Sequence, residues 1–416
     1  MESHLASKDS SITQQFVHKL GPTADWATGR YMRKYFNSGG NSFSPVGVKV
    51  MRFDLTSSGQ EFLDPLTTMV QFKLVNDSWV NGNADTNIHL VNFAPCFIKR
   101  CIIRAGGVTV SDEDYWNRNY HMLMQFSPQS ARDNMAVMSG QKGTVITNEM
   151  TLGFPLLAPL FQQEKALPLS VMSLQVHLEL VDSISDVMVK TADLPGGVNA
   201  QSTAWHIEEP VLITDLIQLD SSLAAEYSSF LLSGKSLSIP YVSYYTVPHV
   251  ITNGPGGFML SQTRSLTRLK AIFVTFSSNA NDKYAYDMKY PSISASAMTE
   301  FVAQIGSEKY PSHGELKTIP EYWHRLLEAI GIHSSVFTTS AISLTEYLGD
   351  SFCIGINLQK VLSEDGKSNY SGKSTKMGDL VSLRCKNIAT SLDTCWVTLV
   401  YDGILNLSEE SAAVYD

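Results

Sequence analysis

The stretch ALPLSVMSLQVHLELVD, residues 166–182, shows more plainly than any other how this chain folds. Apolar and polar residues alternate in it from Ser173 to Leu180, and Pro168 comes shortly before the alternating run. Successive side chains of a β-strand point to opposite faces, so this pattern predicts a strand with one buried face and one polar face. The predicted core residues are Leu174, Val176, Leu178 and Leu180, and the polar positions are Ser173, Gln175, His177 and Glu179.

Short β-rich runs separated by turn residues continue on both sides of this strand. The Gly106-Gly107 pair divides two such runs in residues 96–110 and predicts a hairpin. Strands and helices do not alternate as they do in α/β proteins, so we expect an all-β fold of two antiparallel sandwiches with a few helices. The helical stretches are residues 111–126 with Ser111 or Asp112 as N-cap, residues 221–234 with Ser221 or Ser222 as N-cap, and residues 319–331.

The length of the chain and the position of its loop-like and helical stretches predict its domain organisation. At 416 residues it is too long for one ordinary core. The helical stretch that stops at Gly234 separates two β-rich halves, and the polar first segment ends in the loop-like NSGGNSFSPVG. We therefore expect an N-terminal arm (residues 1–46), a first sandwich (47–220), a helical linker (221–234) and a second sandwich (235–416).

Composition argues against several classes of function. The net charge is −9 and 17% of the residues are charged, which disfavours a nucleic-acid-binding surface spread over the whole protein. No apolar run of roughly 18 or more residues occurs, and the opening MESHLASKDSSITQQ lacks the layout of a secretion signal, so we expect a cytosolic or nuclear protein when it is made. The five cysteines include no CxxC pair, and we expect buried free thiols.

The familiar catalytic and ligand-binding motifs are incomplete in this chain. SGKS at residues 233–236 and SGKST at 371–375 look like phosphate-binding loops, but Ser229 and Lys367 stand where the earlier glycine is needed. No two of the ten histidines have metal-binding spacing, and HIEE at 206–209 is interpreted as the solvated face of a strand. We therefore expect no catalytic activity, no cofactor and no bound metal.

A basic segment lies near the start of the chain. Residues 1–45 carry five lysines or arginines and three acidic residues, so the segment is net positive in a chain of net charge −9. RYMRKYF at residues 30–36 sets three of these charges among aromatic and apolar side chains, a mixture able to bind an anionic surface or a neighbouring subunit. An ordinary first strand or helix with solvated charges is the alternative. The candidate assembly residues are Arg30, Tyr31, Arg33, Lys34, Tyr35 and Phe36.

Several stretches resemble the double jelly-roll major capsid proteins of DNA viruses. ALPLSVMSLQVHLEL at 166–180 resembles a segment that enters a strand of the first jelly roll in that family. GKSLSIPY at 234–241 and SLTRLKAIFVTFSS at 265–278 resemble the opening of the second jelly roll in polinton-like viruses and virophages. DSFCIGINLQKV at 350–361 and VTLVYDGILNL at 397–407 are similar to the last strands of the same proteins.

The resemblance covers the chain in order from about Phe62 to Leu407 and implies two consecutive jelly rolls. It implies a structural protein, the major capsid protein whose trimers form pseudo-hexagonal capsomers in the shell of an icosahedral DNA virus. The implied partners are further copies of the chain, minor or vertex capsid proteins and, through the N-terminal arm, the genome or an internal membrane. The implied location is the virion capsid, with synthesis in the host cytoplasm and assembly there or in the nucleus.

Two other functions stay open at this point. One is a minor or vertex capsid protein built on a single jelly roll with an accessory β domain. The other is a carbohydrate-binding β-sandwich protein, which would need a cluster of exposed aromatic side chains with acids or amides. DEDYWNRNY at residues 112–120 is the candidate for such a cluster.

Overall fold

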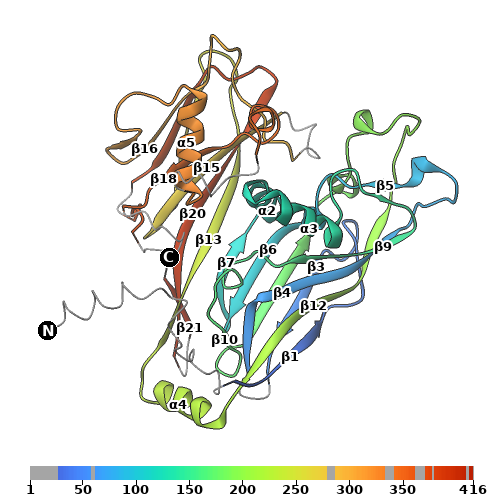
Figure 1. The fold of residues 1–416 in the computed structure, drawn as a ribbon, viewed down its shortest axis with the longest axis vertical. Coiled ribbons are helices and arrows are strands. Elements are labelled where there is room, and N and C mark those ends of the chain that lie inside the picture. The colour runs from blue at the N-terminus through green and yellow to red at the C-terminus, as the bar shows by residue number, and fades with distance from the viewer. Residues whose placement is uncertain are drawn as a thin grey trace, which may run out of the picture.

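The computed structural model of the chain describes residues 27–57, 61–278, 286–332, 342–360, 371–376, 379–408 and 412–415. Two antiparallel β-sandwiches stand side by side in it, and helix α4 (Ser221–Leu232) connects them at one end (Figure 1). Each sandwich has two principal sheets, and a small sheet of β5 (Ile88–His89) and β8 (Val145–Ile146) accompanies the first. The expected all-β architecture with a few helices is confirmed.

The first sandwich encloses its core between a six-stranded and a four-stranded sheet. The six-stranded sheet has the order β1-β12-β4-β10, with β2 also paired to β12 and β9 to β4. Its strands are β1 (Ala27–Phe36), β2 (Ser42–Phe43), β4 (Glu61–Asn76), β9 (Glu149–Pro155), β10 (Leu167–Pro168) and β12 (Trp205–Leu219). The four-stranded sheet has the order β3-β11-β6-β7, with β3 (Val50–Leu55), β6 (Ile98–Ala105), β7 (Val108–Glu113) and β11 (Leu174–Leu180).

The alternating stretch of the sequence forms strand β11, in the interior of the four-stranded sheet. Strands β3 and β6 flank it, so that Val176 has Phe53 on one side and Ile103 on the other. All four predicted core residues are fully buried, whereas the three polar positions within the strand are partly exposed on the outer face. Each buried leucine or valine contributes about 1.5–3 kcal/mol to stability, which explains why the register is well defined.

The second sandwich is built in the same way. Its five-stranded sheet has the order β13-β20-β15-β18, with β21 also paired to β20, and its four-stranded sheet has the order β14-β19-β16-β17. The strands of the first are β13 (Leu237–Val250), β15 (Leu269–Ser278), β18 (Ile354–Asn357), β20 (Leu392–Leu407) and β21 (Ala412–Tyr415). The strands of the second are β14 (Phe258–Gln262), β16 (Glu300–Ile305), β17 (Glu308–Tyr310) and β19 (Val381–Lys386).

The helices connect strands, and two of them are capped differently from the prediction. Helix α2 (Trp116–Phe126) begins after Tyr115 rather than at Ser111, because residues 108–113 pair with β6 as strand β7. Asp220 caps α4 in place of Ser221 or Ser222, since its carboxylate accepts a hydrogen bond from the Ser222 amide at 3.1 Å. The other helices are α3 (Gln129–Ser139), α5 (Ile319–Ala329), α6 (Leu344–Tyr347) and the 3-10 helices η2 (Ala84–Thr86), η3 (Ala94–Phe97), η4 (Ile184–Val187) and η5 (Thr191–Asp193).

The two sandwiches share buried residues along one interface, which we call the seam. Five residues of the second half of the chain belong to the same buried cluster as the core of the first sandwich, namely Ile239, Tyr241, Tyr286, Leu405 and Leu407. In return, Met122 and Phe126 of α2 belong to the core of the second sandwich. Figure 1 shows α2 between the strands of the two sandwiches, close to the point where they meet. The seam therefore consists of β7 and α2 on one side and of β13, β20 and β21 on the other.

The segment predicted as an N-terminal arm is partly built into the first sandwich. Strand β1 pairs antiparallel with β12 from Ala27 opposite Leu219 to Phe36 opposite Val211. Tyr35 is 6% exposed, so this strand is anchored in the core. The first sandwich thus includes residues 27–46, which corrects the expected boundary at residue 46, and residues 1–26 of the predicted arm lie outside the described residues.

Candidate assembly surface on strand β1

Strand β1 ends the main path of the six-stranded sheet, and it carries all six candidate assembly residues. Three of its large side chains are exposed: Phe36 by 75%, Met32 by 61% and Tyr31 by 40%. An edge strand presents backbone N–H and C=O groups with which another chain can pair. Because β1 is ten residues long and contains no proline, its edge suits contact with another polypeptide. We call the exposed residues Arg30, Tyr31, Met32, Lys34 and Phe36 the β1 surface.

Arg30 joins β1 to the two strands beside it. Its Nη2 lies 2.7 Å from the Asp64 carboxylate on β4 and 2.9 Å from the Asp215 carboxylate on β12. These two aspartates stand directly opposite each other in the sheet, where like charges repel. The guanidinium of Arg30 compensates this repulsion. Because exposed ion pairs contribute only about 0–1 kcal/mol, the main effect of these contacts is to orient Arg30 on the surface.

Glu61 on β4 forms a second polar cluster of this surface. Tyr31 and Ser57 donate hydrogen bonds to its carboxylate through their hydroxyl groups, and Arg33 Nη1 lies 3.4 Å from Glu61 Oε2. Burial alone would raise the pKa of Glu61, but these hydrogen bonds and the charge of Arg33 outweigh burial and lower it. The carboxylate is therefore ionised at neutral pH and fixes the hydroxyl end of Tyr31.

Tyr35 has a different role from the other candidate residues. Its ring is buried, its hydroxyl donates to the Thr56 carbonyl oxygen at 3.4 Å, and the Arg33 guanidinium lies 5.0 Å from the ring centroid. Tyr35 and Arg33 thus attach β1 to the sandwich, and the structure does not bring Tyr35 to the surface with the rest. Met32 is an exposed member of the same surface that was not among the candidates. The sequence signal for it is its place as the apolar residue of RYMRKYF, among the aromatic and basic side chains.

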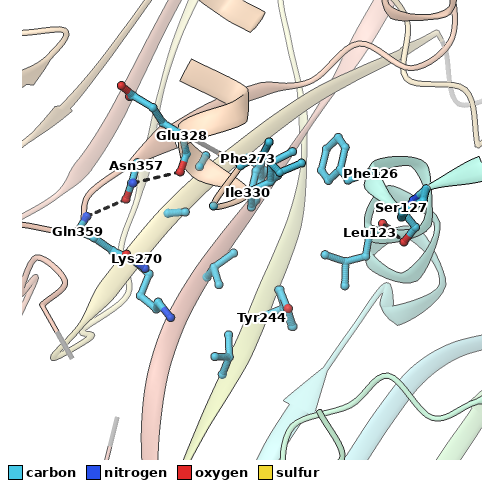
Figure 2. A pocket seen from close by; sticks show the side chains of 17 residues that line it. Leu123, Phe126, Ser127, Tyr244, Lys270, Phe273, Glu328, Ile330, Asn357 and Gln359 are labelled. Atoms are coloured by element: carbon cyan, nitrogen blue, oxygen red, sulfur yellow. Dashed lines mark hydrogen bonds between the residues drawn. The ribbon is translucent and has the colours of Figure 1, made fainter. Parts of the chain in front are cut away.

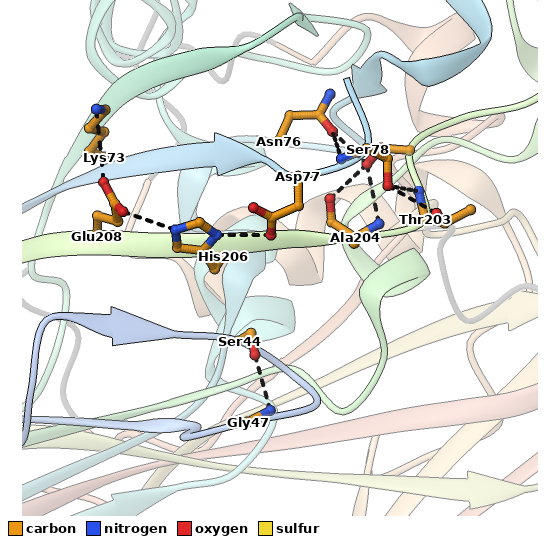
Figure 3. A network of polar contacts seen from close by, with 11 residues as sticks. Ser44, Gly47, Lys73, Asn76, Asp77, Ser78, Thr203, Ala204, His206 and Glu208 are labelled. Atoms are coloured by element: carbon orange, nitrogen blue, oxygen red, sulfur yellow. Dashed lines mark hydrogen bonds and ion pairs between the residues drawn. The ribbon is translucent and has the colours of Figure 1, made fainter. Parts of the chain in front are cut away.

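A polar cluster around His206 lies on strand β12 (Figure 3). His206 Nδ1 is 2.8 Å from Asp77 Oδ2, its Nε2 is 3.0 Å from Glu208 Oε1, and Glu208 is 3.8 Å from Lys73 Nζ. Burial alone would lower the pKa of His206, but the two carboxylates outweigh burial and raise it. Within the described residues, no group of three or more His, Cys, Asp or Glu side chains could hold a metal ion. HIEE is thus a polar strand face, as interpreted from the sequence.

A cavity of about 460 Å³ lies where α2 faces the second sandwich (Figure 2). Phe126 and Phe273 supply apolar walls. On the polar side, Asn357 Nδ2 donates to the Glu328 carbonyl oxygen at 3.1 Å, and Asn357 Oδ1 accepts from the Gln359 amide at 2.9 Å. The described lining includes neither His nor Cys, so it holds no nucleophile paired with an imidazole base. These polar contacts connect α5 to β18 and have a structural role.

The two stretches that look like phosphate-binding loops also have structural roles. In SGKST, the Lys373 backbone pairs with Leu269, and Thr375 Oγ1 accepts a hydrogen bond from the Leu266 amide at 2.9 Å. In SGKS, Gly234 follows α4 with a φ of 78°, a conformation that favours glycine at the end of a helix. All five cysteines are buried and free, and burial raises the pKa of each thiol. None of the described helices is both long and apolar enough to cross a membrane.

DEDYWNRNY does not form the exposed aromatic cluster that carbohydrate binding would need. Trp116 and Tyr120 are buried in the core of the first sandwich, and Trp116 Nε1 donates to the Leu157 carbonyl oxygen at 2.9 Å. The guanidinium of Arg118 lies 4.7 Å from the ring centroids of both Tyr286 and Trp396. Arg118 therefore covers aromatic faces on which a sugar could otherwise stack. The carbohydrate-binding alternative thus loses Trp116 and Tyr120, and of the three aromatic residues in the stretch only Tyr115 is half-buried, with its ring centroid 5.1 Å from that of Trp396.

Solved structures match this chain along nearly its whole length, although no family model matches the sequence and a comparison with curated proteins finds no match. PBCV-1 VP54, fitted into a reconstruction of the virophage Sputnik, is 11% identical with a TM-score of 0.65, covering 96% of this chain and 99% of that one. The Faustovirus major capsid protein is 9% identical with a TM-score of 0.64, and the match covers 97% of this chain and 94% of that one. A chain of the Sputnik virophage is 12% identical with a TM-score of 0.61, and the match covers 97% of this chain and 91% of that one.

The two sandwiches in sequence, together with these matches, define the class of fold. The protein is a double jelly roll, and the fold prediction is confirmed. More particularly, it has the fold of the double jelly-roll major capsid proteins, represented here by those of PBCV-1, Sputnik and Faustovirus.

Proposed function

We propose that this chain is the major capsid protein of an icosahedral DNA virus, with a structural and not a catalytic role. The observation that carries the proposal is the match of both jelly rolls, in order, to the Faustovirus major capsid protein over 97% of this chain and 94% of that chain. A minor or vertex protein with one jelly roll and an accessory domain would share such a fold over only part of its length. The proposed location is the virion capsid.

The shape of the molecule suits the wall of a shell. Strands β13 and β20 have 14 and 16 residues, so at a rise of roughly 3.3 Å per residue they span about 45–55 Å. We propose residues 27–220 and 235–416 as the two jelly rolls of a subunit, joined through residues 221–234. Three such subunits give a block with a six-sided outline that can tile a near-hexagonal lattice. Because each contact is repeated throughout the shell, modest interfaces suffice for a stable assembly.

We propose that the β1 surface contacts a neighbouring capsomer on the inner side of the shell. Two observations support this role: Phe36 and Met32 are exposed by 75% and 61%, and basic side chains accompany them on the same strand. Residues 1–26 precede this strand and hold two lysines and three acidic residues, so the basic charge of the segment is concentrated on β1 itself. In this proposal they continue from the β1 surface toward the genome or an internal membrane, and minor capsid proteins bind at the junctions between capsomers.

The proposed trimer can be tested by size-exclusion chromatography with light scattering. One chain has a mass of 45.9 kDa, and the expected particle has three times this mass. A pentamer would instead indicate a vertex protein, and a monomer at micromolar concentration would contradict the proposal.

Point substitutions on β1 test the assembly surface without removing a strand. Deleting residues 1–45 would remove β1 and β2 from the first sheet, so a loss of assembly would not be informative. The substitutions Met32→Ser and Phe36→Ser together should leave the trimer intact and reduce particle formation at least about tenfold, the effect of losing a contact worth about 2 kcal/mol. Electron microscopy of assembly reactions measures the particles.

Val137→Ser serves as the matched control, because Val137 on α3 is 84% exposed and lies on a different surface element. It should leave particle yield unchanged. Equal yields from the β1 variant and from the control would show that the β1 surface has no part in assembly. Deleting residues 1–26 alone, which spares every described strand, then tests the role of the preceding segment separately.

A further inference from the structure

Glu113 is a carboxyl group buried in the seam between the two jelly rolls. It is the last residue of β7 in the first roll and is 2% exposed. The Tyr244 amide on β13 of the second roll donates a hydrogen bond to Glu113 Oε1 at 3.4 Å. Beside it, Ser111 Oγ lies 3.2 Å from Ser243 Oγ across the same seam. The carboxyl group is thus part of the contact between the two rolls.

The polar contacts of this carboxyl group are weak. Besides the long hydrogen bond from Tyr244, Oε1 accepts one from Ser111 Oγ at 3.5 Å, and the Asn119 side chain adds another. Oε2 has no hydrogen-bond partner among the described residues, and no described cation forms an ion pair with the group. A buried carboxylate without a paired cation is far less stable than the neutral acid in the same place.

The groups around Glu113 also disfavour its charged form. Asp112 precedes it in β7, the Cys101 thiol lies opposite on β6, and the Tyr244 phenol on β13 is near enough for its charged form to repel the carboxylate; the hydrogen bond from Asn119 of α2, in contrast, favours the charged form. Burial raises the pKa of Glu113 from its ordinary value of 4.5 to about 8, Asp112 adds to this rise, and the hydrogen bonds oppose it only in part. At neutral pH the closed seam therefore contains the protonated acid.

We propose that Glu113 is a proton-dependent lock between the two jelly rolls: the neutral acid keeps the seam closed, and release of its proton to solvent loosens it. The proposal concerns the single chain and does not depend on the capsid role. When the seam opens, the carboxyl group regains an ordinary pKa and gives up its proton in mildly acidic solution. The closed form holds more protons than the open form between about pH 5 and pH 8. Opening is therefore favoured about tenfold more strongly for each unit of rising pH in this window, and the dependence ends above about pH 8.

Urea unfolding of the full-length protein across this pH range tests the lock. From pH 5.5 to pH 7.5, the unfolding constant of the wild type should rise relative to that of Glu113→Gln, by up to about 100-fold over the two units. The amide of glutamine has the same shape and cannot ionise. Glu226→Gln, at an exposed position of α4, is the matched control and should follow the wild type. The same pH dependence in the wild type and in Glu113→Gln would overturn the proposal.

Thiol labelling of the native protein locates the opening. Cys101 on β6 lies opposite Glu113 of the seam, whereas Cys395 is buried in the core of the second roll and serves as the reference within each molecule. Mass spectrometry should find a ratio of Cys101 to Cys395 labelling that rises at least about tenfold from pH 6 to pH 8 in the wild type. The ratio should stay constant in Glu113→Gln. A constant ratio in the wild type would show that the pH effect is not located at the seam.

The protonation state of the wild type can be measured directly, which keeps the proposal testable if Glu113→Gln does not fold. Infrared difference spectra with isotope-labelled glutamate should show the band of one protonated carboxyl group at pH 7 that is lost above about pH 8. The absence of this band at pH 7 would overturn the proposal.

Discussion

Arg118 joins the two jelly rolls through aromatic contacts at the seam. It stands in α2 of the first roll, and its guanidinium lies 4.7 Å from the ring centroid of Trp396 on β20 and 4.7 Å from that of Tyr286. Asn117 of the same helix donates a hydrogen bond to the Tyr286 hydroxyl at 2.8 Å. Burial lowers the pKa of Arg118, but an arginine remains charged at any physiological pH. The aromatic faces therefore hold a cation that has lost much of its water.

The substitution Arg118→Ala should lower the free energy of unfolding by about 2–3 kcal/mol, because two largely desolvated cation–π contacts are lost. Arg118→Lys should recover part of this loss, since the ammonium group contacts one ring at a time. Urea denaturation gives the measurement. Arg104→Ala, at an exposed position on β6, should change stability by less than about 0.5 kcal/mol. If the two alanine variants are equally stable, the aromatic contacts of Arg118 do not stabilise the seam.

Strands with one buried face could be predicted from the sequence. Strands in which most side chains are exposed could not. In β11 four buried positions alternate with partly exposed ones, and this regularity is visible in the sequence. In β1 only Tyr35 is buried, so its sequence has no alternating pattern and is easily taken for an arm outside the sandwich. Its pairing partner β12 lies far along the chain, so local patterns do not reveal the pairing. The candidate residues on β1 were found from their charge and aromatic content, while their separation into core and surface required the structure.

Helix α3 was not predicted for a similar reason. Only Met135 and Ser139 of its eleven residues are buried, so its sequence has no apolar stripe of the usual width. The start of α2 was misplaced because serine and acidic residues, which favour helix N-termini, here continue the strand after the Gly106-Gly107 turn. Pairing with β6 outweighs the local preference of these residues. The seam, including Glu113 and Arg118, depends on contacts between distant segments and had no signal in the sequence.

The capping of α4 leads to a prediction about the connection between the rolls. Asp220→Ala should destabilise the protein by about 1 kcal/mol, because the first turn of the helix loses the hydrogen bond from the Ser222 amide. Urea denaturation measures the change. Ser229→Ala, at an exposed position in the interior of the same helix, should leave stability within about 0.5 kcal/mol of the wild type. An unchanged stability of Asp220→Ala would mean that α4 forms without this cap.

At the scale of the whole molecule, the first jelly roll is incomplete without the second. Ile239, Tyr241, Leu405 and Leu407 fill part of the first core, and removing them would leave that core open to water. We therefore expect residues 1–234, expressed alone, to be insoluble or to lack fixed tertiary packing. Co-expression with residues 235–416 should restore a soluble complex. Near-ultraviolet circular dichroism of the isolated first half measures its packing, and a native-like spectrum would contradict the expectation.

The distance along the chain between β1 and its partner has a consequence for synthesis in the cell. Arg30 and Asp215 are 185 positions apart, and at about 5–20 residues per second the ribosome needs roughly 10–40 s to reach the second after the first. Until then β1 has no strand to pair with. The core of the first jelly roll is completed only when Leu405 and Leu407 have been synthesised, near the end of translation. A nascent chain cannot display the finished β1 surface. Neighbouring ribosomes on one messenger can therefore make many copies close together before any of them carries the finished surface, and in the proposed capsid role only released chains would join a shell.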